Sequence, residues 1–326
     1  MTNDNKVQIF FTKKHHINLI SCVIVWLSGV LFIYKIFNDP ALKIIFYSLT
    51  FPIVLILIER VEKYYKLSLT KNILFLTMLI LTAASILLYR LDYIGYPSII
   101  GFSILWLLIF YHSQNVKTSL MQLAVFLLSP ALYLEIISFS GSFLLVMLVI
   151  VSIFISERYL DNKKLDWEFF LVAFLFGVTL SAQLLVSFIY LIYLLYNFRN
   201  NITNGLIFVL AMLAAYTLLF FLADKEYTVI TASQTNYFQM IPVWIIILLF
   251  LITTYVGWIV ADLQEVLFVS GIILFFIYLL SFILLVSEIG WNKNGLDFSL
   301  LVMAIPFLVL SIKEYKVDRF LGKILE

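Results

Sequence analysis

Charged residues are scarce in this sequence. Asp, Glu, Lys and Arg make up 12% of its 326 residues, whereas they make up about 25% of a typical soluble domain. A water-soluble fold of this length needs far more polar surface than these residues supply. The composition therefore excludes a soluble globular protein. The absence of any run rich in Lys or Arg also argues against nucleic acid as a partner.

Cysteine and histidine are almost missing. The single cysteine, Cys22, cannot form an internal disulfide. None of the three histidines stands at metal-ligand spacing with a cysteine or a carboxylate, so the sequence predicts no metal site, and nothing in it supports a cofactor or a bound divalent cation. The chain also lacks a G-x-x-x-x-G-K-[ST] loop, a G-x-S-x-G elbow, a potassium-filter sequence and a G-x-x-x-G pair.

Long hydrophobic runs are what the sequence does contain. Hydrophobic residues make up 63% of the chain, and they form blocks rather than alternating with polar residues, which is typical of membrane-spanning helices of about 20 residues. We expect an all-α, polytopic transmembrane helical bundle of about 12 spans. Residues 1–326 form a single integral membrane domain in this prediction, with no separate soluble domain. The predicted helices cover 17–37, 44–59, 72–89, 97–113, 119–139, 142–157, 167–182, 183–198, 204–223, 241–261, 265–287 and 297–313.

The block 167–198 is the least certain part of this prediction. It is continuously apolar except near Ser181 and Gln183, and each half is short for a span. Two short spans, one long helix and a re-entrant hairpin all fit it. Thr179, Ser181 and Gln183 are expected to join neighbouring helices by hydrogen bonds.

The distribution of basic residues predicts which loops face the cytoplasm. With two spans in 167–198 and the N-terminus inside, sixteen Lys and Arg residues fall on the inner side and five on the outer side, as expected because cytoplasmic loops are enriched in Lys and Arg. We therefore expect a multi-pass protein of the cell inner membrane with both termini cytoplasmic. The segment 17–37 is expected to be a retained helix, because no small-x-small cleavage site follows it.

Three acids at predicted outer helix ends are candidate catalytic residues. A carboxylate just above the membrane can accept a proton from an acceptor hydroxyl. Each acid also has a structural interpretation: Asp39 belongs to an Asn-Asp-Pro turn, Asp92 is close enough to Arg90 to pair with it, and Glu135 is near enough to the interface to reach water. Both interpretations stay open for Asp39, Asp92 and Glu135.

Substrate-binding candidates are found in the same outer segments. A phosphate group requires a cation, and Arg90, Lys43 and Lys225 are the candidates on the outer face. Tyr93 and Tyr96 lie beside Asp92, where they either contact substrate or belong to the aromatic belt of the membrane interface. The polar outer loop 224–240 is expected either to cover a substrate cavity or to be an ordinary solvated loop.

One stretch resembles a known enzyme family. From Ser129 to Ser181 the sequence has a Ser-Pro-Ala-Leu segment, a Ser/Gly corner, a long apolar helix, a basic turn and Gly-Val-Thr-Leu-Ser. This pattern resembles the central part of GT-C superfamily glycosyltransferases that use polyprenyl-phosphate sugars. The resemblance implies an outward-facing site in which an acid in an outer loop acts as the base. Ser142 and Phe143 stand where such enzymes often carry an acid, and Gln183 where a Lys is common.

The function that the sequence favours follows from this resemblance. We expect a glycosyltransferase-like protein that moves a sugar from a polyprenyl-phosphate carrier to an envelope acceptor, with membrane lipid as a second partner. A multi-span transporter or lipid flippase, and a non-catalytic subunit of an envelope assembly complex with membrane-protein partners, are the alternatives. The N-terminal run Phe10–Asn18 also resembles uncharacterised polytopic membrane proteins of Bacteroidetes, which implies no activity.

Overall fold

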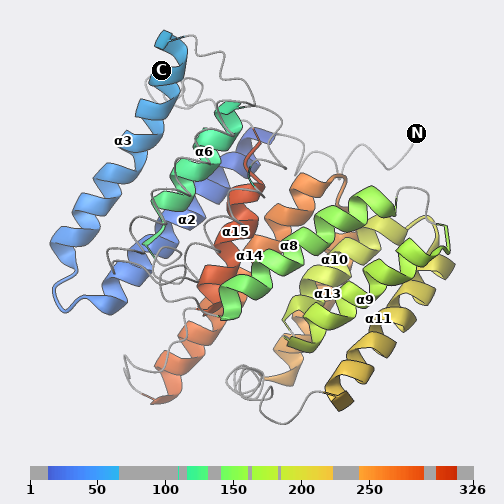
Figure 1. Cartoon of the computed structure of the whole chain (residues 1–326). Helices are drawn as coiled ribbons and strands as arrows, with labels where there is room; N and C mark the ends of the chain where they lie inside the picture. Colours follow the sequence, from blue (N-terminus) through green and yellow to red (C-terminus); the bar gives the residue numbers. More distant parts are fainter. Residues whose placement is uncertain are drawn as a thin grey trace, which may run out of the picture. The chain divides into compact units, whose positions relative to one another are not determined.

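The described part of the chain is entirely α-helical. The computed structural model describes residues 14–65, 109, 116–130, 141–160, 164–182, 185–222, 242–289 and 299–313. Within these residues there are ten α-helices and no strand (Figure 1), so the all-α prediction is confirmed. The chain divides into two compact units. Unit 1 comprises Met1–Phe143 with Asp297–Glu326, and unit 2 comprises Leu144–Leu296.

The ten helices correspond to ten of the twelve predicted segments. Unit 1 contains α2 (Lys14–Ile36), α3 (Ala41–Tyr65), α6 (Val116–Leu127) and α15 (Ser299–Leu310). Unit 2 contains most of α8 (Gly141–Tyr159), together with α9 (Trp167–Ala182), α10 (Val186–Phe198), α11 (Ile202–Leu222), α13 (Val243–Ile259) and α14 (Leu263–Ile289). The predicted helices 72–89 and 97–113 lie outside the described residues, apart from Ile109.

Four of these helices are long and apolar enough to cross a membrane. They contain the segments His16–Tyr34, Ala41–Ile58, Ile202–Leu219 and Leu263–Leu280. The chain is therefore a multi-helix protein with several candidate membrane spans, and the count of twelve remains a prediction.

One predicted helix ends early. The segment 119–139 was expected to be one span, but α6 ends at Leu127, and Ser129 lies outside any helix. Pro130 explains this end. Its ring disfavours helical geometry at the residue before it, and it has no N–H to donate to a helical carbonyl.

The core of unit 1 begins with two helices joined by a short turn. Trp26 of α2 donates its indole N–H to the Ser48 hydroxyl of α3 at 3.3 Å. A Cβ atom at Gly29 would clash with the Tyr47 ring, so the glycine allows α2 and α3 to approach closely at this level. The turn between the helices contains Asn38, Asp39 and Pro40.

The segment 167–198 forms two helices that fold back on each other. Phe176 of α9 stacks on Tyr190 of α10 with ring centroids 4.0 Å apart, and Phe169 meets Phe198 at 6.1 Å. In one continuous helix, residues 176 and 190 would be about 21 Å apart. The single-long-helix alternative is therefore wrong, because the chain reverses direction between α9 and α10.

Small residues set the closest helix contacts of unit 2. A Cβ at Gly177 of α9 would lie 2.5 Å from the Met212 carbonyl oxygen and 2.6 Å from the Ala215 Cβ of α11. A Cβ at Gly257 of α13 would lie 2.9 Å from the Ile192 Cα of α10. α10 thus lies inside the unit, with α9 and α13 among its neighbours (Figure 1).

The outer faces of several helices are apolar. On α3 the exposed residues follow a spacing of three or four, which places them on one face of the helix: Leu42, Phe46, Leu49, Ile53 and Leu57. On α13 the exposed face carries Trp244 near its start and Trp258 near its end. Faces of this kind are unusual against water. They suit lipid, with Trp residues at the interfaces.

Candidate functional site

Two of the eight predicted site residues lie in the described part of the chain, and both belong to the α2–α3 turn. Asp39 is exposed in the turn, and Lys43 is exposed in the first turn of α3. The Lys43 ammonium sits 3.5 Å from the centroid of the Phe37 ring, an attractive cation–π arrangement. The Asp39 carboxylate and the Lys43 ammonium are therefore both exposed at this end of unit 1.

The other predicted site residues lie outside the described residues. They are Asp92, Glu135, Arg90, Lys225, Tyr93 and Tyr96. The expectation that Asp39, Asp92 and Glu135 face one cavity therefore stays a prediction.

A cluster of hydrogen bonds between Asn18, Thr118, Gln122, Ile312 and Lys313, here called the polar cap, lies at the end of unit 1 that is remote from Asp39. The last turn of a helix leaves carbonyl oxygens without partners, and at the end of α15 other helices supply the donors. Gln122 of α6 donates its amide to the Ile312 carbonyl at 2.8 Å, and Thr118 donates its hydroxyl to the Lys313 carbonyl. The Lys313 N–H in turn donates to the Asn18 side chain of α2 at 3.2 Å.

The cap fixes the relative directions of these helices. α2 and α6 begin at the cap, and α15 finishes there. All three of these helix ends belong to the side that the loop charges predict to be cytoplasmic. α2 has 23 residues and is therefore about 34 Å long, which is close to the thickness of the hydrocarbon core. Asp39 and Lys43 thus lie about one membrane thickness from the cap.

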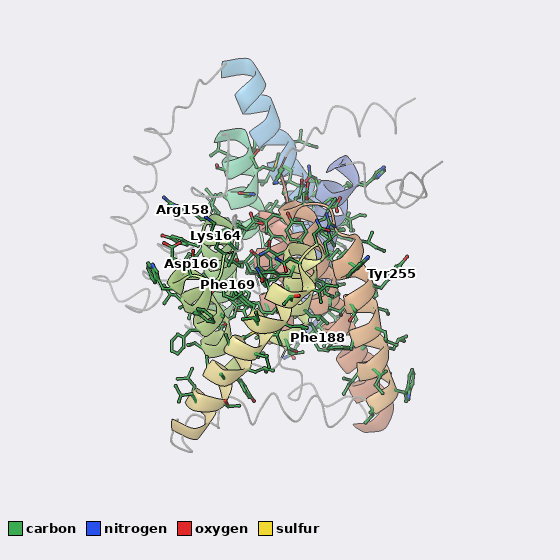
Figure 2. All side chains as sticks on the ribbon, turned by 90° about the vertical axis from the view of Figure 1, so that its right-hand side faces the viewer. Arg158, Lys164, Asp166, Phe169, Phe188 and Tyr255 are labelled. Carbon is green, nitrogen blue, oxygen red and sulfur yellow. The ribbon has the colours of Figure 1, made fainter. Side chains whose placement is uncertain are left out.

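A charged end forms at one extremity of unit 2. Arg199, after α10, donates to the Val260 carbonyl at the end of α13 with an N–O distance of 2.8 Å. Its guanidinium carbon lies 5.9 Å from the Tyr196 ring centroid. Figure 2 shows Arg158, Lys164 and Asp166 close together above Phe169, and Phe169 contacts Phe198, which is next to Arg199.

Helix caps account for much of this charged end. Asp262 accepts from the Glu265 N–H at 3.0 Å, and Glu265 accepts from the Ala261 N–H at 2.8 Å. Asp262 is therefore the N-cap of α14, and Glu265 binds the backbone of the residue before the cap. Asp166 caps α9 by accepting from the Phe169 N–H at 3.0 Å. These side chains thus stabilise the starts of α9 and α14. The charged end also contains the three loops of unit 2 that the sequence predicts to be cytoplasmic.

Buried hydroxyl groups join three helices inside unit 2. The Thr179 hydroxyl of α9 hydrogen-bonds to the Tyr190 hydroxyl of α10, and Ser156 of α8 donates to the Tyr193 hydroxyl at 2.5 Å. Tyr190 and Tyr193 are fully buried. Thr179 therefore links helices in the way expected of the polar group in this segment, whereas Gln183 lies outside the described residues.

The packing of Gly177 of α9 on Met212 and Ala215 of α11 was not predicted from the sequence. Ala173, Gly177 and Ser181 recur every fourth residue on α9, and Ala173 and Gly177 are buried. Small residues at this spacing let helix backbones approach in membranes. A search for alanine and serine as well as glycine at this spacing would have found the face.

Nothing among the described residues forms a metal centre. The described part of the chain contains no group of three or more His, Cys, Asp or Glu residues that could hold a metal ion.

The chain matches no protein-family model, no curated protein and no solved structure.

Proposed function

We propose that this protein is an integral membrane glycosyltransferase that moves a sugar from a polyprenyl-phosphate carrier to an envelope acceptor at the outer face of the membrane. Asp39, Asp92 or Glu135 acts as the base in this proposal. Lys43, Arg90 and Lys225 bind the phosphate, and Tyr93 and Tyr96 contact the substrate. The protein has about twelve spans and both termini in the cytoplasm.

The arrangement of α8, α9 and α10 is the observation that carries the proposal. Ser156 of α8 meets Tyr193, and Phe176 of α9 meets Tyr190 and Tyr193. α9 runs antiparallel to α10, and the Ser156–Tyr193 hydrogen bond places the last turns of α8 beside the last turns of α10. α8 therefore begins towards the end of the unit where α9 finishes.

This arrangement matters because of the resemblance to GT-C enzymes. The Ser/Gly corner at the start of α8 and the Gly177–Ser181 segment at the end of α9 carry that resemblance. Their two helix ends point the same way, as parts of one site must. The α2–α3 turn adds the remaining support, since it exposes an acid and a cation about one membrane thickness from the polar cap of unit 1.

The division into units offers no support for a transporter built from two consecutive halves. α15, near the end of the chain, packs with α2 and α6 in unit 1. Two six-span halves would instead place the last helix with the second half of the chain. We therefore test glycosyl transfer before transport.

The test is sugar transfer by membranes that contain the protein. Labelled polyprenyl-phosphate sugars serve as donors, and product formation is compared for the wild type, Asp39→Asn, Asp92→Asn and Glu135→Gln. Loss of a general base lowers the rate by about 10²- to 10⁴-fold, so we expect one of the three variants to lose activity on this scale. Lys43→Gln is expected to raise the KM for the lipid donor.

Asp166→Asn is the matched control. It makes the same carboxylate-to-amide change at the charged end of unit 2, and asparagine still caps a helix start, so activity should be retained. Wild-type activity that survives all three site substitutions would refute the list of acids. Absence of transfer by the wild type from every polyprenyl-phosphate sugar offered would refute the function.

A further inference from the structure

The exposed face of α13 has a tryptophan near each end. Trp244 is 66% exposed and Trp258 is 52% exposed, and they lie about 21 Å apart along the helix axis. Between them the exposed side chains are apolar except for Tyr255, which points away from the other helices of unit 2 (Figure 2). Tryptophan is enriched at the two interfaces of a bilayer, whose hydrocarbon core is about 30 Å thick. The two tryptophans are therefore closer together than the interfaces of an ordinary bilayer.

The direction of these side chains does not restore the missing distance. Side chains on a helix tilt toward its N-terminus, so the Trp244 and Trp258 rings are displaced along the axis in the same direction. A tilt of α13 in the membrane shortens the projection of the helix on the bilayer normal. The axial distance between the two tryptophans therefore describes the largest spacing of the interfaces that this face fits.

The ends of α13 set a second limit on the thickness of the hydrocarbon. Pro242 and Val260, which flank the helix, have extended backbone with ψ of 137° and 133°. Backbone that is exposed to lipid inside the hydrocarbon core must be helical, and Val243, the first residue of α13, is 71% exposed. α13 has 17 residues and is about 26 Å long. The hydrocarbon beside α13 is thus no thicker than about 26 Å.

α3 repeats this pattern in unit 1. Its exposed apolar face extends from Leu42 to Leu57. Lys43 lies in the first turn of the helix, and Glu59 follows the last exposed leucine, so these two residues are about 24 Å apart along the axis. Charged side chains are costly inside the hydrocarbon core. A lipid-facing helix of the other unit therefore has an apolar face of nearly the same height.

The longer helices extend past this height. The candidate spans of α2 and α14 are 50% and 67% buried, whereas that of α3 is 11% buried, so lipid contacts α2 and α14 less. Thr203 and Asn204 lie in the first turn of α11, so part of that helix also lies beyond the hydrocarbon. The height of the lipid-facing surface is therefore given by α3 and α13, whose limits are marked by charge or by tryptophan.

We propose that the lipid-facing surface of this protein is about 21–26 Å high and that the surrounding phospholipids thin to match it. The partner that this surface fits is a phospholipid annulus thinner than the bulk membrane. A bilayer thins around a short apolar surface at a cost that rises with each ångström of mismatch. α9 and α10, about 24 Å and 20 Å long, are also short enough for such an annulus. This inference does not depend on the proposed sugar transfer.

Reconstitution of the wild type into bilayers of different thickness tests the proposal without any substitution. The purified protein is placed in vesicles of dimyristoleoyl, dioleoyl or dierucoyl phosphatidylcholine, which share a headgroup and increase in acyl-chain length. The half-life of the folded protein at one raised temperature is measured from its peak on a sizing column. We expect this half-life to be about tenfold longer in the shortest lipid than in the longest. A longest half-life in the dioleoyl or dierucoyl lipid would overturn the proposal.

Tryptophan emission in the same vesicles tests the position of the interfaces. The chain has six tryptophans, and two variants keep only Trp244 or only Trp258, with phenylalanine at the other five positions. The matched control replaces all six by phenylalanine and adds Leu251→Trp, midway between the two on the same exposed face. Each variant must elute from the sizing column like the wild type.

We expect Trp244 and Trp258 to emit at longer wavelength than the Leu251→Trp control, because they lie at the interfaces and the control lies at the bilayer centre. Their emission should also stay the same in all three lipids, since the annulus follows the protein. Emission from either tryptophan that matches the control would mean that it does not mark an interface. A blue shift of Trp244 or Trp258 with increasing chain length would mean that the lipids do not thin. Either result overturns the proposal.

Discussion

Enlarging Gly177 tests the closest helix contact in unit 2. An alanine Cβ would lie 2.5 Å from the Met212 carbonyl oxygen, whereas ordinary contact begins at 3.4 Å. The obstructing atom belongs to the backbone, so α9 and α11 must separate by about 1 Å, which weakens the dispersion contacts along their whole interface. Overpacking of this kind costs about 1–3 kcal/mol.

A second effect opposes this cost. Alanine favours a helix over glycine by about 1 kcal/mol. Because the backbone oxygen cannot rotate away, the clash should outweigh this gain. We expect Gly177→Ala to lower the free energy of unfolding by about 1–2 kcal/mol, and Gly177→Val to lower it further. The assay is titration of the purified, detergent-solubilised protein with SDS, followed by tryptophan fluorescence.

Two adjacent alanines of α11 provide the matched control. Ala215 is buried against Gly177, and Ala214 is exposed. Ala215→Val should destabilise the protein, whereas Ala214→Val should change the free energy of unfolding by no more than about 0.5 kcal/mol. If Gly177→Ala is as stable as the wild type, or if the two valine variants behave alike, the described packing of α9 on α11 is incorrect.

Three further substitutions probe polar contacts, each by the same SDS titration. Gln122→Leu should cost about 1–3 kcal/mol, because the buried Ile312 carbonyl, just after α15, loses its Gln122 donor; equal stability would contradict the polar cap. Tyr193→Phe should cost about 1 kcal/mol, and its effect should disappear in a Ser156→Ala background, because the two hydroxyls bond to each other. Asp262→Ala should cost about 1 kcal/mol by removing the cap of α14, and Asp262→Asn should not.

Helix positions were predictable from the sequence because they follow from local patterns. The predicted helix 167–182 has the same bounds as α9, since Asp166 and Trp167 mark its start and the apolar run marks its extent. At Pro130 the prediction was wrong, because it followed the apolar run through the proline to residue 139. The structure instead ends α6 at Leu127.

Partnerships between distant residues were not predictable in the same way. Gln122 and Ile312 are far apart in the sequence, and no local pattern around either residue predicts their hydrogen bond. Tyr193 appeared as one more aromatic residue in an apolar run, although its hydroxyl is bonded to Ser156. In the candidate site, sequence reasoning correctly placed Asp39 in a turn after a long helix. Convergence of the acids depends on tertiary packing, which local pattern does not specify.

The sidedness of unit 2 depends on whether the chain reverses after α9, and not on how far the hairpin penetrates. A hairpin that starts and ends at the charged end leaves α11 on the same side whether its tip stops inside the bilayer or emerges from it. One continuous helix would instead have put the loop after α10 across the membrane from Asp166. Phe169 contacts Phe198, which excludes that separation. Arg199 also donates to Val260 beside the α13–α14 loop, so a second loop of the unit is tied to the same side by a direct bond.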